Sequence, residues 1–530
     1  MKEYVVVAND ESSIDQLHLE LTSDTSGNVL VDSSIIPNRP VEVANPRLVN
    51  PRITHYFLSD EEADSLSKDI RVTCVNPLPT KDLIKSYTID PKFLKKIEKP
   101  ISYNSNPGNF DRIFEDSRYN INWGLRRTSV THAELKAGNS YNYDVDGSGV
   151  DIIISDDGIE LDHPEFTNEE GVSRIHPIDW YKWTGLPGTM PPKHYSTAGL
   201  YQAQHGTHVA AIAVGKTFGY AKNSRIYSLR TLGDDDQTIP ISDLFDLIRV
   251  WHSKKPLDKA TGSRRPTIVN LSWGFIGQYP TDINRIFYRD NLRAYNDPIQ
   301  RQSNLGQVNK NHGFRVPSVD IEAQMCEDAG VIFVRAAGNT SHKVDIQGGL
   351  DFNNYYTSSS LWMDYLPAGQ PIYYHKGASP MTKNTINVSS GANTTILSGN
   401  NLKEKIDSFS ERGPGCDLVA PGNSITSASS KMAGFGFNEY VWGKVDQKKF
   451  NSIPLSGTSQ AAPQVSGVIA LYLSRYPAAT PSDVKNWLRK VSIKDQLLTD
   501  NLTDAWESPR SLLGGENLYL YNPFRNGYRD

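Results

Sequence analysis

The segment Leu455–Pro463, which reads Leu-Ser-Gly-Thr-Ser-Gln-Ala-Ala-Pro, most constrains the fold, and it runs into the apolar segment Val465–Leu473. The small residues predict a tight turn, and the apolar segment predicts a buried helix with Ser459 in its first turn. N–H groups in that turn lack intrahelical partners and would stabilise negative charge developing beside the Ser459 hydroxyl. Ser459 is therefore either an ordinary helix N-cap or a catalytic nucleophile, and other motifs must decide.

Three motifs precede this segment. Ile152–Ile159 is an apolar strand pattern that ends in Asp-Asp-Gly, His205–Ala211 reads His-Gly-Thr-His-Val-Ala-Ala, and Val334–Asn339 reads Val-Arg-Ala-Ala-Gly-Asn. Together with Gly-Thr-Ser-x-Ala-x-Pro around Ser459, they resemble in order the aspartate, histidine, asparagine and serine segments of subtilisin-like serine peptidases. Four ordered motifs in one chain favour the nucleophile over the N-cap.

The resemblance implies a catalytic triad of Asp156, His205 and Ser459. A serine hydroxyl is hardly ionised at neutral pH, so it needs a base, and a histidine can accept its proton there. Asp156 would hold His205 and stabilise its charged form. Asn339 and the Ser459 backbone N–H would bind the oxyanion.

Two neighbours of the triad receive other interpretations. His208 follows one helical turn after His205, and we expect it to be structural. Asp157 stands where many family members carry Ser or Thr, and we expect a solvated carboxylate or one close to a metal ion.

The segment Thr267–Gly274 is predicted to be a strand, and its end resembles the edge segment with which the family pairs an extended peptide substrate. Small residues on the walls predict an open slot for a sizeable apolar side chain before the scissile bond. The expected wall residues are Ser272, Trp273, Gly274, Ala336, Ala337 and Gly338.

The N-terminal region has its own pattern. Tyr4–Ala8, Ile53–Phe57 and Ile70–Val75 are predicted strands, and a capping box of Ser59 and Glu62 begins a short helix before the third. The polar stretch between the first two strands has no clear assignment. The strand–helix–strand run resembles the last half of the family's inhibitory propeptide, which covers the active site; the alternative is an unrelated small α+β module.

Length and composition fit a folded chain with more than one domain, since 530 residues contain 38% hydrophobic and 22% charged residues. The resemblance implies an α/β fold with a mostly parallel central sheet flanked by helices. The expected layout is a propeptide-like domain at 1–80, a linker with the self-cleavage site at 81–120, a peptidase domain at 121–500 with insertions near 167–204, 275–318 and 341–377, and a tail at 501–530.

Charge and cysteine content limit the partners. A net charge of −5 without a dense Lys/Arg patch does not indicate nucleic-acid binding, and three widely spaced cysteines predict free thiols. The apolar run near Met1 is too short for a signal peptide, and no stretch reaches the roughly 20 apolar residues of a membrane span. We therefore expect a cytoplasmic protein, or part of an assembly built in the cytoplasm, without membrane contact.

No cofactor is expected to be required. The acidic run Asp234–Asp236 is either a solvated turn or a structural calcium site, as acidic loops are in many family members. The expected partners are polypeptide substrates and the chain's own N-terminal domain, which would act as an intramolecular inhibitor.

The sequence therefore predicts a serine endopeptidase made as a proenzyme. The alternative is a latent or inactive peptidase scaffold that acts as a structural or interaction subunit of a cellular or viral assembly, which the long insertions motivate. An inactive scaffold is free to lose Asp156, His205, Asn339 or Ser459, and none is lost, which favours the enzyme.

Overall fold

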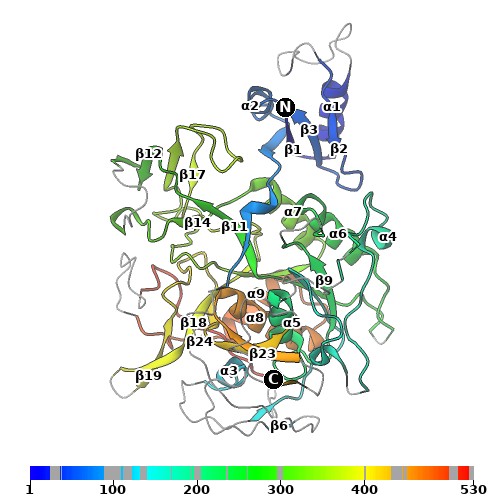
Figure 1. Ribbon diagram of the computed structural model, residues 1–530, viewed down its shortest axis with the longest axis vertical. Coiled ribbons are helices and arrows are strands. Elements are labelled where there is room, and N and C mark those ends of the chain that lie inside the picture. Colours follow the sequence, from blue (N-terminus) through cyan, green and yellow to red (C-terminus); the bar gives the residue numbers. More distant parts are fainter. Residues whose placement is uncertain are drawn as a thin grey trace.

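A computed structural model describes two folded parts, a small N-terminal one and a larger one that follows it (Figure 1). The described residues are 1–23, 36, 39–88, 109–111, 122–131, 140–168, 170–192, 194–195, 204–233, 237–259, 261–294, 303–398, 401–430, 444–445, 450–499 and 511–524.

Within these ranges, a nine-stranded sheet forms the centre of the larger part, in the order β24-β25-β20-β18-β15-β10-β8-β9 with β19 against β18. All pairs are parallel except β24–β25 and β18–β19. The predicted α/β class is confirmed. The strands are β8 (Asp151–Asp156), β9 (Arg225–Arg230), β10 (Thr267–Leu271), β15 (Ile332–Ala336), β18 (Ile386–Ser398), β19 (Asn401–Ile406), β20 (Leu418–Pro421), β24 (Ile493–Lys494) and β25 (Leu518–Tyr519).

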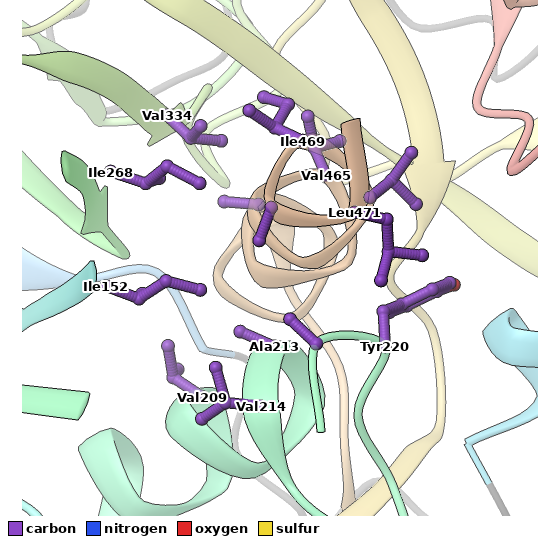
Figure 2. Packing of buried hydrophobic residues seen from close by; sticks show 14 of the residues in the cluster. Ile152, Val209, Ala213, Val214, Tyr220, Ile268, Val334, Val465, Ile469 and Leu471 are labelled. Atoms are coloured by element: carbon purple, nitrogen blue, oxygen red, sulfur yellow. The ribbon is translucent and has the colours of Figure 1, made fainter. Parts of the chain in front are cut away.

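Helices cover both faces of this sheet because its central strands are apolar on both sides. Successive strand side chains point to opposite faces, so Ile152 and Ile154 join one apolar cluster and Ile153 the other. On the first face α8 (Thr458–Arg475) packs beside α5 (Gln204–Val214), as Figure 2 shows. The other helices of the larger part are α3 (Trp123–Arg127), α4 (Trp180–Thr184), α6 (Ile241–Lys254), α7 (Pro317–Asp328) and α9 (Pro481–Val491).

The N-terminal part is an antiparallel sheet in the order β2-β3-β1-β4 with two helices on one face. The predicted capping box is confirmed, because Ser59 and Glu62 bond reciprocally at the start of the second helix. The first helix lies in the unassigned stretch, where Asp10 caps it. The elements are β1 (Lys2–Ala8), α1 (Glu11–Thr22), β2 (Val43–Asn45), β3 (Ile53–Leu58), α2 (Asp60–Leu66) and β4 (Val72–Pro77).

The other face of the N-terminal sheet packs on the larger part. Val5, Val7 and Ile53 form an apolar cluster that Ile321 of α7 contacts. Near this cluster the Arg47 guanidinium enters the larger part and forms ion pairs with Asp246 of α6 and Glu322 of α7.

Two predicted boundaries are wrong. Residues 81–88 are not a linker, because a short 3-10 helix, Lys81–Leu83, leads into strand β5 (Ile84–Ser86), which pairs with β11 (Trp273–Gln278). In Figure 1 this blue segment runs from the N-terminal part into the larger part. Residues 511–524 are not a tail either, since β25 enters the central sheet and Leu520 and Phe524 are buried.

Parts of the second and third predicted insertions form a small sheet together, in the order β13-β12-β16-β17. The remaining strands, including this sheet, are β6 (Asn109–Asp111), β7 (Ser140–Asn142), β12 (Ile283–Tyr288), β13 (Asn291–Arg293), β14 (Asn311–Gly313), β16 (Tyr355–Ser358), β17 (Ile372–Tyr373), β21 (Ile425–Ser429), β22 (Lys444–Val445) and β23 (Phe450–Leu455).

The three cysteines are free, as predicted. In the part of the chain that the structure describes, no helix is long and apolar enough to cross a membrane.

Candidate active site

The ends of β8 and α5 bring Asp156 and His205 together. Asp156 is the last residue of β8, at the carboxyl edge of the parallel sheet, and His205 lies in the first turn of α5. His205 Nδ1 is 2.7 Å from Asp156 Oδ1, and both side chains are largely buried. With the proton on Nδ1 donated to Asp156, Nε2 is left as the basic nitrogen.

The pKa of His205 reflects two opposing effects. Burial is the largest single effect and lowers it, since the charged ring loses hydration, but the charge and hydrogen bond of Asp156 together with the charge of Asp157 outweigh burial. The net pKa of His205 is above its ordinary value of 6.5. The pair therefore forms a base that is stronger than a free histidine.

Asp157 does not have the role expected for it. Its carboxylate accepts the backbone N–H groups of His205 (3.1 Å) and Gly206 (2.6 Å), so it anchors the first turn of α5. Burial and the neighbouring Asp156 carboxylate raise the pKa of Asp157 well above its ordinary value, and the two N–H groups only partly offset this increase. In place of the expected solvated carboxylate, the structure shows a side chain that fixes the backbone carrying His205, and proximity to a metal ion stays a prediction.

Ser459 lies in the first turn of α8, and Tyr87 of the N-terminal segment lies directly against it. The Ser459 hydroxyl accepts the Tyr87 N–H (2.9 Å) and donates to the Ser272 carbonyl (2.9 Å). The Ser459 N–H donates to the Tyr87 carbonyl oxygen (3.2 Å). A side chain at Gly457 would approach that oxygen to 2.0 Å, so this position must stay glycine for the carbonyl to enter.

The segment before Tyr87 is bound as an added β-strand. Ser86 pairs with Trp273, and Lys85 pairs with Gly274, in antiparallel register. The Tyr87 N–H also donates to the Ser272 carbonyl (3.2 Å). The backbone of 272–274 thus receives an extended peptide, whereas the Trp273 indole N–H donates to Ser155 (3.0 Å) and ties that side chain to β8.

The other predicted wall residues lie in different surroundings. Ala336 belongs to the same apolar cluster as Tyr87, but Ala337 packs in a separate cluster with Val344 and Cys416. Gly338 lies beside a buried carboxylate, that of Glu411, and its φ of +132° is one that residues with a side chain rarely adopt.

Asn339 is held with its amide nitrogen available. Its Oδ1 accepts the backbone N–H (3.0 Å) and the hydroxyl (2.9 Å) of Thr458, and the same hydroxyl accepts the Gly338 N–H (3.1 Å). These bonds orient the side chain, and Asn339 Nδ2 then has no partner among the described residues.

Three of the four predicted catalytic residues carry a buried polar atom without a partner among the described residues. Asp156 Oδ2, His205 Nε2 and Asn339 Nδ2 are all buried and have no hydrogen-bond partner within the described ranges. Most buried polar atoms are paired, because an unpaired one costs about 1–3 kcal/mol. Unpaired capacity on three of these residues is the pattern expected where a reaction supplies the missing partners.

His208 has the structural role predicted for it. Its Nε2 lies 3.0 Å from both the Ile425 and Ile453 carbonyls, and burial lowers its pKa to about 3, so the ring is neutral at physiological pH. The acidic run 234–236, expected to be either a solvated turn or a calcium site, lies outside the described residues. In those that are described, no group of three or more His, Cys, Asp or Glu side chains could hold a metal ion.

Sequence reasoning missed Tyr87, Thr458 and the anchoring role of Asp157. Tyr87 has no local signal, because an extended segment binds a sheet edge through its backbone and needs no characteristic composition. Thr458 is part of the serine motif, and its position next to Ser459 was the available signal.

Comparisons with known proteins agree with the resemblance that the sequence motifs show. The model of the subtilase family, peptidase S8, matches residues 147–508. An "Extracellular serine proteinase" of Thermus sp. (strain Rt41A) is 27% identical over 369 residues, 69% of this chain and 60% of the relative. A "Putative subtilisin-like proteinase 1" of Encephalitozoon cuniculi is 24% identical over 386 residues, 70% of this chain and 65% of the relative.

Among solved structures, fervidolysin from Fervidobacterium pennivorans, described as a keratinolytic enzyme related to subtilisin, is 18% identical. The match covers 97% of this chain and 60% of that one, with a TM-score of 0.49. The matches thus span less than two thirds of the length of these relatives. The family match itself spans more than half of this chain and includes Asp156, His205, Asn339 and Ser459, so the chain belongs to the subtilase family of serine peptidases.

Proposed function

We propose that this chain is a serine endopeptidase made as a proenzyme, with Asp156, His205 and Ser459 as its triad. Residues 1–87 act as the intramolecular inhibitor, and the bond between Tyr87 and Thr88 is the one that the enzyme cuts in itself. The alternative, an inactive scaffold, is not favoured because every catalytic group is retained.

One observation carries this proposal, the placement of the Tyr87 backbone. The Tyr87 carbonyl accepts from the Ser459 N–H, and the Tyr87 N–H contacts the Ser459 hydroxyl. Strand β5 is paired with β11 up to the residue before Tyr87. A peptide held by its backbone, with one carbonyl on an oxyanion donor next to the nucleophile, has the arrangement of a substrate.

The reaction follows from this arrangement. The Ser459 hydroxyl turns from the Ser272 carbonyl toward His205 Nε2, gives up its proton there and attacks the Tyr87 carbonyl carbon. The Ser459 N–H and Asn339 Nδ2 stabilise the oxyanion. Charged His205 then donates its proton to the Thr88 nitrogen as the C–N bond breaks, and water releases the acyl group by the same steps.

The test is intact-mass analysis of the purified full-length chain over time, with and without a fluorophosphonate probe. We expect fragments 1–87 and 88–530, a new N-terminus at Thr88, and one probe adduct on Ser459. Absence of an adduct both before and after limited proteolysis of the segment following Thr88 would exclude an activated serine. A cut at another bond alone would contradict the assignment of Tyr87.

Replacing Asn339 with alanine is expected to slow self-cleavage by about 10²–10³-fold, because one of the two oxyanion donors is lost. The magnitude is borrowed from the corresponding asparagine of subtilisin. Asn339→Asp is the sharper variant, since its carboxylate can still accept from Thr458 but no longer donates, and its charge repels the oxyanion. First-order rate constants from gel densitometry give the comparison, and a wild-type rate in Asn339→Asp would exclude the donor role.

Self-cleavage is expected to accelerate as pH rises, with a midpoint above 6.5, because His205 must be neutral to accept a proton and its pKa is raised. Below that pKa the ring is charged and the rate falls about tenfold for each pH unit. Rate constants between pH 5 and 9 test this, with far-UV circular dichroism at each pH as the control for folding. A midpoint at or below 6.5 would contradict the raised pKa.

A further inference from the structure

The Tyr87 side chain lies in a pocket whose polar end contains two buried charged residues, Arg335 and Glu411. Tyr87 is only 2% exposed, so the pocket encloses the whole ring. The reaction described above uses only the backbone of Tyr87 and gives these charges no function. We call this site the Tyr87 pocket and define it by Gly274, Ala336, Gly338, Ala378, Arg335 and Glu411.

Two glycines open the walls of the Tyr87 pocket. A methyl group at Gly274 would lie 2.2 Å from the Tyr87 hydroxyl oxygen and 3.0 Å from Ala378 Cβ. A methyl group at Gly338 would lie 2.5 Å from the Glu411 carboxyl carbon. The phenolic oxygen therefore lies against the Gly274 wall next to Ala378, and the carboxylate lies against the Gly338 wall.

Arg335 is held by two hydrogen bonds, and one of its N–H donors is unpaired. Its Nη2 donates to the Ala337 carbonyl (3.0 Å), and its Nη1 donates to Asn387 Oδ1 (3.1 Å). Arg335 Nε is buried and has no partner among the described residues. Glu411 accepts a hydrogen bond from the Thr340 hydroxyl at 2.5 Å, and burial raises the pKa of this carboxyl to about 7.

The Tyr87 hydroxyl is the complementary unpaired group. It has no hydrogen bond of normal geometry to a described residue. It interacts electrostatically with the Arg335 guanidinium and, to a smaller extent, with the Glu411 carboxyl group. A buried donor and a buried hydroxyl that are both unpaired cost free energy, and that cost is removed when they meet. The pocket is thus built for an aromatic ring with a polar tip.

We propose that Arg335, positioned by Asn387 and the Ala337 carbonyl, makes the enzyme select tyrosine over phenylalanine before the scissile bond. This inference rests on the proposed peptidase function and names its substrate class, peptides with a phenolic side chain at that position. A purely apolar pocket distinguishes a ring from its hydroxylated form only weakly. A pocket with buried polar groups rejects the ring without a hydroxyl, because those groups are left unpaired.

The test compares two peptides that copy residues 82–92 and carry either tyrosine or phenylalanine at the position of Tyr87. For the wild-type enzyme, counted by fluorophosphonate labelling, we expect kcat/KM to be about tenfold or more higher for the tyrosine peptide. Arg335→Met should bring the ratio close to one, and Arg335→Lys should restore part of it. Both peptides are measured on the same preparation, so loss of folded enzyme cancels in the ratio.

A ratio close to one in a labelled wild-type enzyme would overturn this inference and leave the peptidase function intact. If the wild-type chain is not labelled by the probe, the inference is tested in the Ser459→Ala variant, in which Tyr87 stays uncut and in its pocket. There, Tyr87→Phe should lower the first thermal unfolding midpoint when Arg335 is present and leave it unchanged in Arg335→Met. Equal shifts in both backgrounds would overturn the inference without reference to activity.

Discussion

Ser459→Ala is expected to leave the chain uncut between Tyr87 and Thr88 and to lower kcat/KM for peptides by about 10⁴- to 10⁶-fold. The upper figure is borrowed from subtilisin, a member of the same family. The effect is this large because His205 and Asp156 act only through the nucleophile, so the whole triad is lost with one oxygen atom. The residual rate comes from the oxyanion donors and the bound peptide backbone.

Intact mass after prolonged incubation measures the first part, and cleavage of a peptide covering 82–92 measures the second. Ser466→Ala is the matched control, because this serine lies in the same helix and donates to Asn270 Oδ1 (2.9 Å). Its loss costs about 1 kcal/mol of stability and should leave self-cleavage unchanged. A cut after Tyr87 in purified Ser459→Ala would show that another nucleophile acts.

Arg47→Ala is expected to weaken the hold of the N-terminal domain on the peptidase domain by about 3–5 kcal/mol, or roughly 10²- to 10³-fold in affinity. The guanidinium donates to Asp246 Oδ2 (2.8 Å) and Glu322 Oε1 (3.0 Å), and all three side chains are at most 4% exposed. Removing the cation leaves the buried Glu322 carboxyl without its counter-charge and leaves Asp246 with Arg249 (2.9 Å) alone, which is the costly way to break a buried ion pair.

The measurement is a delay between two events. Intact-mass analysis detects self-cleavage, and a fluorogenic peptide detects the later appearance of activity. Arg47→Ala should shorten this delay. Arg39→Ala is the control, because Arg39 pairs with Glu62 inside the N-terminal domain and at a partly exposed position, which is worth less than about 1 kcal/mol. Equal delays in wild type and Arg47→Ala would show that β5 alone holds the domain.

A further variant separates the effect of the buried charges from the effect of side-chain shape. A triple variant, Arg47→Met with Asp246→Leu and Glu322→Met, replaces the buried charges with apolar side chains, which is often neutral or stabilising. This variant should regain most of the delay that Arg47→Ala loses. If it does not, the N-terminal domain depends on the hydrogen bonds around Arg47, such as that from Asn50 to Asp246.

Local patterns were sufficient for elements whose chemistry lies within a few residues. The capping box at Ser59 and Glu62 and the strand that ends at Asp156 agree with the structure. The capping box depends on interactions between neighbours in sequence, and the strand carries a continuous run of β-branched apolar residues, so the residue types indicate both. The helix Glu11–Thr22 had a cap at Asp10 and apolar residues at helical spacing, and it was missed because its surface is otherwise polar.

The position of strand β5 was not accessible from sequence. Its pairing with β11 joins residues nearly 190 positions apart through backbone bonds, which leave no mark on composition. The same holds for β25, whose place in the central sheet makes residues 511–524 part of the core. Long-range backbone pairing is decided by how the rest of the chain folds.

The sequence by itself determined the family, the α/β class and the candidate catalytic residues, because a nucleophile, base and oxyanion donor require particular side chains in motifs of fixed order. Only the tertiary structure decided which segment lies against Ser459. Tyr87 reaches Ser459, and Arg335 comes beside the Tyr87 hydroxyl, because the docked N-terminal domain delivers β5 to β11. That juxtaposition depends on packing between distant elements, and it converts a list of catalytic residues into a proposed cleavage site and a proposed specificity.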